Sequence, residues 1–195
     1  MKPNQNLYTL TSDIITGLQT ILEEYKPDYV YVHGDTTTTM AASIASFYAG
    51  AKVCHVEAGL RTNNKKSPFP EEMNRQITSK IAKYHFSPTI LSKENLIREG
   101  VNENDVIVTG NTVIDALHMV IGKIKTSESI RNNVGLVIQN KGYNTNRIIN
   151  GKRIVLITGH RRENFGEGFI NICRGIKELV SKYKDVDFIY PMHLN

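Results

Sequence analysis

The chain has 195 residues, of which 40% are hydrophobic and 22% charged, and its formal net charge is +5 at pH 7. This composition is typical of a folded globular protein and excludes a disordered or low-complexity chain, while the length allows one domain or parts of two. Because the 24 basic and 19 acidic residues are interspersed, no nucleic-acid partner is indicated, and the positive balance equally suits an anionic small molecule such as a sugar nucleotide.

Cysteine usage and hydropathy favour a reducing, aqueous compartment. Cys54 and Cys173 both lie within apolar runs, so we expect two buried free thiols, and their spacing offers no zinc site. The first residues do not read as a signal peptide, and no apolar run approaches membrane-spanning length. The expected location is the cytoplasm, without a membrane partner.

Apolar periodicity and turn residues predict alternating helices and strands over the first 110 residues. A helix with one apolar face is expected over 12–25. The predicted strands are 29–33, 52–56, 84–87 and 105–109, and the predicted helices are 37–48, one opening at Pro70, and 89–98. Strand, helix and strand at this spacing form a βαβ unit, so the sheet should be parallel.

The helix that opens at Pro70 carries Met73, Ile77 and Ile81 at helical spacing, which predicts a buried apolar face. Two glutamates directly follow Pro70, where the positive end of a helix stabilises negative charge. This charge–dipole contact is the plain structural explanation for both carboxylates. The histidines at 55, 85 and 118 are expected to be packed or exposed bystanders.

Beyond residue 122 the composition changes. Residues 122–151 are polar and weakly periodic, as is typical of a linker or peripheral segment. A strand, a helix and a strand are then predicted at 153–158, 168–183 and 187–193. Two strands and one helix cannot close a core of their own, so this second domain is expected to be incomplete.

Ionisable residues follow several of the predicted strands. The first strand leads into His33-Gly34-Asp35 and a run of four threonines, at the strand end where ligands bind in open α/β sheets. Taken alone, this turn is explained equally well if Asp35 or one of the threonines is only the N-cap of the following helix. Glu57, Glu71 and His160 also lie at or just beyond strand ends, where a shared cleft would gather them as acids and bases.

The arginines in or near the turns that follow these strands are suited to binding a diphosphate. Guanidinium groups are available at positions 61, 75, 161 and 162. The sequence has no GxGxxG, P-loop or GxSxG motif and no clustered metal ligands, which excludes the common dinucleotide, kinase and serine-hydrolase interpretations. The residues alone indicate a pair of α/β domains that bind a phosphorylated or nucleotide ligand in a cleft.

Six ordered segments carry a more specific resemblance. They are residues 33–39, 55–62, 67–75, 109–115, 158–164 and 190–195. In this order they resemble the motifs of the non-hydrolysing UDP-N-acetylglucosamine 2-epimerases, over nearly the whole chain except about 122–150. The resemblance implies a GT-B-like α/β fold, in which two Rossmann-like parallel-sheet domains, both incomplete here, face a cleft.

The resemblance also implies domain boundaries and partners. Residues 1–118 would be part of the N-terminal Rossmann-like domain, 119–151 a hinge or peripheral segment, and 152–195 the start of the C-terminal Rossmann-like domain. The full-length family member would be a homodimer, and its substrate a UDP-sugar used for surface polysaccharides.

Members of that family interconvert UDP-N-acetylglucosamine and UDP-N-acetylmannosamine without an added cofactor. The implied route is anti elimination of UDP to 2-acetamidoglucal, followed by re-addition of UDP. Asp35, Glu57 and Glu71 match the family's carboxylates and are assigned to proton transfer at C2 and sugar positioning, whereas His160 is assigned to the diphosphate. Which carboxylate serves which half-reaction is left open.

Four further residues are secondary candidates for substrate binding. They are Arg61, Arg75, Arg161 and His193. Each either binds nucleotide, at the active or a regulatory site, or only pins a loop.

The sequence departs from the family at both ends. Members begin with a strand and a Gly-Thr-Arg-Pro-Glu loop, and they continue past residue 193 with a serine–glutamate region that holds the uridine and ribose. Neither is matched, so we expect this chain to be a fragment that is inactive and poorly folded alone. The alternatives are a hydrolysing 2-epimerase, which releases free N-acetylmannosamine and UDP, and a non-catalytic nucleotide-binding fragment.

Overall fold

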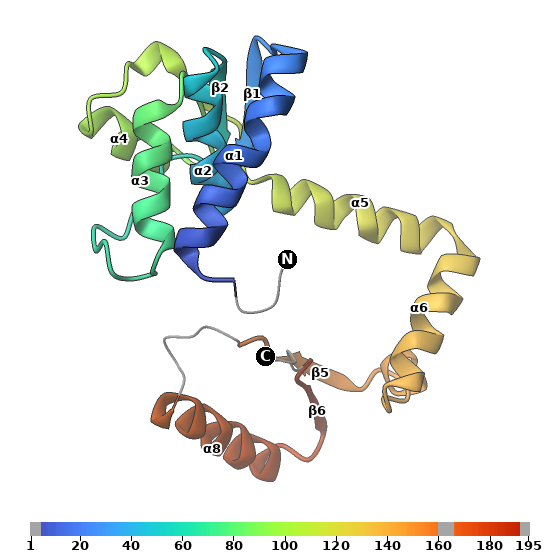
Figure 1. Cartoon of the computed structure of the whole chain (residues 1–195). Helices are drawn as coiled ribbons and strands as arrows, with labels where there is room; N and C mark the ends of the chain where they lie inside the picture. The colour runs from blue at the N-terminus through green and yellow to red at the C-terminus, as the bar shows by residue number, and fades with distance from the viewer. Residues whose placement is uncertain (1–4, 160–165, 192–195) are drawn as a thin grey trace. The chain divides into compact units, whose positions relative to one another are not determined.

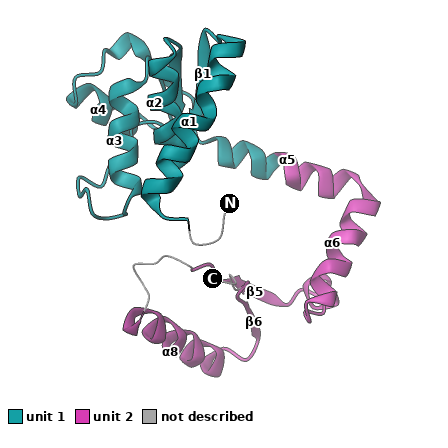
Figure 2. Cartoon of the chain, viewed as in Figure 1, with its two compact units in different colours: residues 1–118 teal, residues 119–195 magenta. Residues whose placement is uncertain are grey.

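A computed structural model of the chain describes residues 5–159 and 166–191 (Figure 1). The chain divides into two compact units, residues 1–118 and 119–195 (Figure 2). The helix α5, Thr112–Thr126, begins in the first unit and ends in the second.

The first unit is an α/β layer structure built on one parallel sheet. Its strands are β1 (Tyr29–His33), β2 (Lys52–Val56), β3 (Tyr84–Ser87) and β4 (Val106–Val108), in the order β1-β2-β3-β4 with every neighbouring pair parallel. Its helices before α5 are α1 (Leu7–Tyr25), α2 (Thr37–Tyr48), α3 (Glu71–Ile81) and α4 (Ile90–Arg98), with a 3-10 turn at Glu103–Asp105. The parallel βαβ arrangement predicted from the sequence is confirmed.

One face of this sheet is covered by helices. Helices α1, α2 and α3 pack in a row, with α2 against β1 and β2, and α4 against β3 and β4 (Figure 1). Along β1 the side chains alternate, so Val32 is buried while Tyr31 is exposed. Small residues of α2, including Ala41 and Ser43, are fully buried and allow the close approach of its neighbours.

The other face of the sheet carries paired aromatic rings. The rings of Tyr31 and Phe86 stack with centroids 6.0 Å apart, and those of Tyr29 and Tyr84 lie 6.2 Å apart. Tyr29 and Tyr31 are nevertheless exposed, as is Ile107 on β4. Since parallel sheets normally bury both faces, this aromatic face is unusual for its exposure.

Helix α3 contradicts the predicted buried apolar stripe. Met73 is 40% exposed, and the buried residues of the helix are Glu72, Asn74, Arg75, Thr78 and Ser79. The polar face is turned inward because it meets backbone groups of the turns that follow β1 and β2, which provide hydrogen-bond partners. Apolar spacing on this helix therefore does not mark the core.

The second unit has a short parallel sheet of its own. Strands β5 (Arg153–Leu156) and β6 (Val186–Ile189) pair in parallel, and α8 (Glu167–Lys182) connects them. The segment predicted as a polar linker is largely helical, with α6 at Glu128–Asn140 and α7 at Asn146–Ile149.

Cys54 is buried as predicted, but Cys173 on α8 is exposed, contrary to prediction. No described residue of α8 is buried, so its apolar face, with Cys173, is left uncovered. Among the helices that the structure describes, none is both long and apolar enough to cross a membrane.

Candidate active site

The carboxylates of Asp35 and Glu57 follow neighbouring strands. His33 and Val56, the last residues of β1 and β2, are paired in register, and the backbone N–H of Gly34 donates to the carbonyl of Val56 at 3.0 Å. Gly34 has a φ of +74°, and a Cβ there would lie 3.4 Å from Oε2 of Glu57. The glycine thus lets the two turns close together at the same edge of the sheet.

The threonines, and not Asp35, cap helix α2. The Oγ1 of Thr36 accepts a hydrogen bond from the backbone N–H of Thr39 at 3.2 Å, and the Thr39 hydroxyl donates to the carbonyl of His33 at 2.6 Å. The Asp35 carboxylate instead receives a hydrogen bond from the Nη2 of Arg75 at 2.5 Å. With its side chain 31% exposed, Asp35 is held and still accessible.

Glu57 occupies a strained backbone position. Its φ is +68°, a left-handed conformation that is uncommon for a residue with a side chain. Its Oε2 lies 3.6 Å from Nε2 of His33, and its side chain is 30% exposed. Strain of this kind is found at ligand-binding and catalytic positions, which agrees with the candidate role of Glu57.

The neighbouring glutamates of α3 have different surroundings. Glu71, a candidate catalytic residue, is the first residue of the helix and is partly buried. Asn74, one turn later, donates from Nδ2 to the Asp35 carbonyl at 2.9 Å, which places the start of α3 beside the turn after β1. Glu72 is fully buried, although only Glu71 was a candidate from the sequence.

The pKa of Glu72 reflects opposing influences. Burial raises the pKa of this carboxyl, but hydrogen bonds from the Thr62 N–H and the Gln76 side chain, together with the Arg75 charge, leave it below its usual value. Glu72 is therefore a buried carboxylate that stays ionised at neutral pH.

The two described candidate arginines are both engaged within the first unit. Arg61 directs Nε and Nη2 to the Glu99 carboxylate at 2.7 and 2.8 Å, Nη2 also to Ser79 Oγ, and Nη1 to the Leu60 carbonyl. Its side chain is almost completely buried, a geometry that suits pinning of the loop after β2. Arg75 spans the carboxylates of Asp35 and Glu72.

His55, which the sequence predicts to be a packed or exposed bystander, is bonded to the turn after β1. Its Nε2 lies 2.8 Å from the Gly34 carbonyl, so this nitrogen carries the proton in the bond. Burial lowers the pKa of His55 to about 4, against the opposing effect of the Gly34 bond, and burial likewise lowers the pKa of the adjacent His85 to about 4. Both imidazoles are neutral at pH 7, and His55 supports the turn that carries Asp35.

Three of the predicted site residues, His160, Arg161 and His193, lie outside the described residues. The structure therefore brings together Asp35 and Glu57, with α3 and its first residue Glu71 beside them. It reveals Glu72, Asn74 and His55 as further polar residues of this edge.

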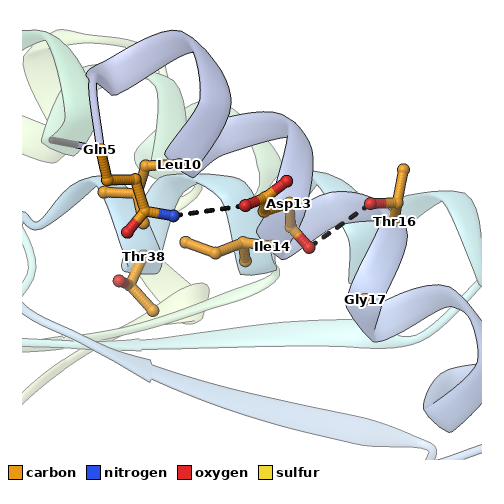
Figure 3. Close-up of a pocket in the computed structure, with 7 residues that line it drawn as sticks. All are labelled: Gln5, Leu10, Asp13, Ile14, Thr16, Gly17 and Thr38. Atoms are coloured by element: carbon orange, nitrogen blue, oxygen red, sulfur yellow. Dashed lines mark hydrogen bonds between the residues drawn. The ribbon is translucent and has the colours of Figure 1, made fainter. Parts of the chain in front are cut away.

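A groove lies elsewhere on the first unit. This groove, of about 620 Å³, runs along α1 and the start of α2. Figure 3 shows its lining residues, among which Gln5 and Asp13 are joined by a hydrogen bond of 3.3 Å. Its remaining lining residues are Leu10, Ile14, Thr16, Gly17 and Thr38. None of the candidate carboxylates lines this groove. The candidate site is therefore identified by its ionisable side chains and not by the volume of a groove.

Comparison with known proteins agrees with the chemistry of this edge. A probable UDP-N-acetylglucosamine 2-epimerase of Ralstonia solanacearum is 50% identical over 196 residues, which cover all of this chain and 50% of that protein. The UDP-N-acetylglucosamine 2-epimerase of Campylobacter jejuni is 48% identical over 195 residues with the same shares. The chain thus spans about half the length of the curated relatives that it matches.

Solved structures give the same result. The UDP-GlcNAc 2-epimerase of Neisseria meningitidis, bound to UDP-GlcNAc, matches with a TM-score of 0.91 and 49% identity over 100% of this chain and 50% of that chain. The enzyme of Methanocaldococcus jannaschii, in complex with UDP-GlcNAc and UDP, matches with a TM-score of 0.79 and 32% identity over 98% of this chain and 49% of that chain. These matches confirm the predicted α/β fold class. The family model for UDP-N-acetylglucosamine 2-epimerase matches residues 1–195, and the chain belongs to that family.

Proposed function

We propose that the protein formed with this chain catalyses the reversible C2 epimerisation of UDP-N-acetylglucosamine to UDP-N-acetylmannosamine. Membership of the family and the UDP-GlcNAc in the related structures support the substrate class. The observation that carries the proposal is the pair of accessible carboxylates, Asp35 and Glu57, on adjacent strand ends, next to the helix that Glu71 opens.

The chemistry requires an acid and a base near C2 and a stabilised leaving group. In the elimination step a carboxylate removes the C2 proton, the C1–O bond breaks, and UDP leaves as a C1=C2 double bond forms in 2-acetamidoglucal. UDP then adds back at C1 while a proton is delivered to the opposite face of C2. We assign proton transfer and sugar positioning to Asp35, Glu57 and Glu71, and stabilisation of the diphosphate to His160, with Arg161 and His193 as supporting candidates.

The arginines receive more restricted roles. Arg75 already pairs with Asp35, so we propose that it orients that carboxylate. Arg61 has its guanidinium donors committed to Glu99, Ser79 and Leu60, and we propose that it stabilises the loop after β2.

We also propose a domain assignment and a biological setting. Residues 1–118 form part of an N-terminal Rossmann-like domain, 119–151 a connecting segment, and 152–195 the start of a C-terminal Rossmann-like domain. The complete enzyme is a cytoplasmic homodimer, and its product, a nucleotide-activated amino sugar, is the form that glycosyltransferases consume in surface polysaccharide synthesis. Analytical ultracentrifugation of a protein as long as the curated relatives tests whether it is a dimer. Loss of surface polysaccharide on deletion of the gene tests the pathway.

A chimera tests the reaction. Residues 1–195 replace the matching half of the Ralstonia relative, and the chimera and the 195-residue chain alone are incubated with UDP-GlcNAc and followed by NMR. We expect the chimera to yield UDP-N-acetylmannosamine and the chain alone to yield no turnover. Free N-acetylmannosamine with UDP would instead support a hydrolysing enzyme, and UDP binding without turnover in the chimera would support a nucleotide-binding fragment.

A further inference from the structure

Glu72 is the only carboxylate with zero exposure among the described residues, and both of its carboxylate oxygens have polar partners. Its Oε1 accepts hydrogen bonds from the backbone N–H of Asn63 at 3.2 Å and from Nε2 of Gln76 at 3.0 Å. Its Oε2 accepts from the backbone N–H of Thr62 at 3.1 Å and lies 3.4 Å from Nη1 of Arg75. Oε1 thus accepts two hydrogen bonds, whereas Oε2 accepts one hydrogen bond and forms an ion pair with Arg75.

One side of this network reaches Asp35. While Nη1 of Arg75 faces Glu72, its Nη2 donates to Oδ2 of Asp35 at 2.5 Å. The Arg75 side chain is only 10% exposed, and its buried Nε has no hydrogen-bond partner within the described part of the chain. The orientation of this guanidinium is therefore set by its two terminal nitrogens, each on a different carboxylate.

The other side of the network holds the loop after β2. Asn63 has a φ of +61°, a left-handed conformation that asparagine adopts more readily than most residues. The Glu72 carboxylate satisfies the N–H groups of both Thr62 and Asn63, which fixes the loop at this turn. A single buried carboxylate therefore joins the loop after β2 to the turn after β1.

We propose that Glu72 is a positioning residue for catalysis, which fixes the Asp35 carboxylate through Arg75 and, at the same time, the loop at Thr62 and Asn63. The proposal rests on the role proposed for Asp35. Glu72 itself, with no exposed surface, does not touch substrate. A role limited to stabilising the helix start would not need the ion pair with Arg75, one turn later on α3, which connects Glu72 to Asp35.

The charge of Glu72 is required by this geometry. A glutamine at position 72 would keep one acceptor oxygen but would turn an NH₂ group toward donors that need an acceptor. In the variant Glu72→Gln, Arg75 thus loses one of its two anchors or the loop loses its contacts. Thr78→Val is a matched control, because Thr78 is also fully buried on α3 and its hydroxyl bonds only within the helix, to the Asn74 carbonyl.

The first test uses the chimera and needs no turnover. Nitrogen-15 NMR of the Arg75 side chain measures rotation of the guanidinium, which is slow when each terminal nitrogen is held by a different carboxylate. We expect Glu72→Gln to accelerate this rotation about tenfold, as the loss of one partly buried ion-pair contact implies, and Thr78→Val to leave it unchanged. An unchanged rate in Glu72→Gln would overturn the proposal.

The second test measures kinetics in the chimera. We expect Glu72→Gln to reduce kcat roughly 10- to 100-fold with a KM within about threefold of the parent, since Asp35 is misplaced while substrate contacts remain. Equal losses in Glu72→Gln and Thr78→Val would show a merely structural role. An inactive parent chimera would contradict the proposed function but not the guanidinium result.

A second variant covers the case in which Glu72→Gln does not fold. Arg75→Lys keeps a positive charge beside Asp35, but its single ammonium cannot span two carboxylates. The proposal predicts the same selective loss of kcat, and a folded Arg75→Lys chimera with the parental kcat would overturn it.

Discussion

The Nη2 atom of Arg75 lies 2.5 Å from Oδ2 of Asp35, across 40 residues of sequence. This ion pair joins helix α3 to the turn after β1, so the candidate carboxylate has a fixed position before any ligand arrives. Asp35 remains 31% exposed, whereas the Arg75 side chain is 10% exposed. A held but accessible carboxylate is what preorganised proton transfer requires.

Arg61 should matter for stability more than its surface neighbours. Its planar fork contacts both oxygens of Glu99 from a side chain that is almost fully buried, and lysine cannot reproduce this geometry. We expect Arg61→Lys to lower the free energy of unfolding by about 2–3 kcal/mol in urea denaturation. Arg98→Lys, on the exposed face of α4, should change it by less than about 0.5 kcal/mol. Equal effects of the two substitutions would contradict the pinning role.

Gly59 should tolerate no side chain. Its φ is +89°, and a Cβ would lie 2.1 Å from the carbonyl oxygen of Ser92 on α4. We expect Gly59→Ala to destabilise the first unit by about 3 kcal/mol or more, measured by thermal or urea unfolding, because backbone atoms must move. Gly17→Ala is the control: it lies within α1, nothing is within 4 Å of its Cβ, and it should stabilise by about 0.5–1 kcal/mol. A neutral Gly59→Ala would mean that α4 is not docked as described.

Acidification should destabilise the fold through two buried histidines. The pKa values of His55 and His85 are lowered from 6.5 to about 4 by burial, so below pH 6.5 the unfolded chain binds protons that the folded chain does not. The free energy of unfolding should therefore fall as the pH decreases, by about 1.5 kcal/mol per histidine between pH 6.5 and about 5. Urea denaturation across this range tests the sign.

His85→Gln supplies the control for that experiment. It removes one of the two titrating groups, so the slope of stability against pH should be about half of the parental slope. A free energy of unfolding that stays constant or rises on acidification would contradict the burial of both imidazoles.

The aromatic face of the sheet offers a comparison between adjacent residues. Tyr31 is 66% exposed and Val32 is 6% exposed. We expect Tyr31→Thr to reduce binding of a hydrophobic fluorescent dye with a stability change of less than about 1 kcal/mol. Val32→Thr should cost about 1–2 kcal/mol, because it buries a hydroxyl, and should not reduce dye binding. A larger loss of stability in Tyr31→Thr than in Val32→Thr, with dye binding unchanged in Tyr31→Thr, would show that the aromatic face is covered in solution.

The sequence predicts the elements of the first unit well where the apolar periodicity and the bounding turn residues indicate the same limits. The strands at 29–33 and 52–56 have the predicted bounds, as has the helix at 37–48, because β-favouring runs and turn residues mark their ends. The predicted turn chemistry was ambiguous, and the structure resolves it: Thr36 caps the helix, which leaves the Asp35 carboxylate for Arg75.

Burial could not be predicted from apolar spacing on α3. Met73, Ile77 and Ile81 have the period of a core stripe, yet Met73 is exposed and Glu72 is buried. The outcome depends on tertiary contacts, since the Thr62 and Asn63 N–H groups and Arg75 make a buried carboxylate favourable. Nothing local in the sequence distinguishes Glu72 from Glu71. The role of His55 could not be predicted either, because its hydrogen-bond partner is the carbonyl of Gly34, 21 residues away in the sequence.

Solvent deuterium at C2 tests most directly whether Asp35, Glu57 and Glu71 transfer the proton in an elimination and re-addition of UDP. The chimera is incubated with UDP-GlcNAc in D₂O, and the recovered nucleotide sugars are analysed by NMR. We expect deuterium at C2 of the UDP-N-acetylmannosamine formed, and incorporation reduced at least about 100-fold in Asp35→Asn, Glu57→Gln and Glu71→Gln. Epimerisation with the C2 hydrogen retained, or undiminished exchange in all three variants, would contradict the proton-transfer role of these carboxylates.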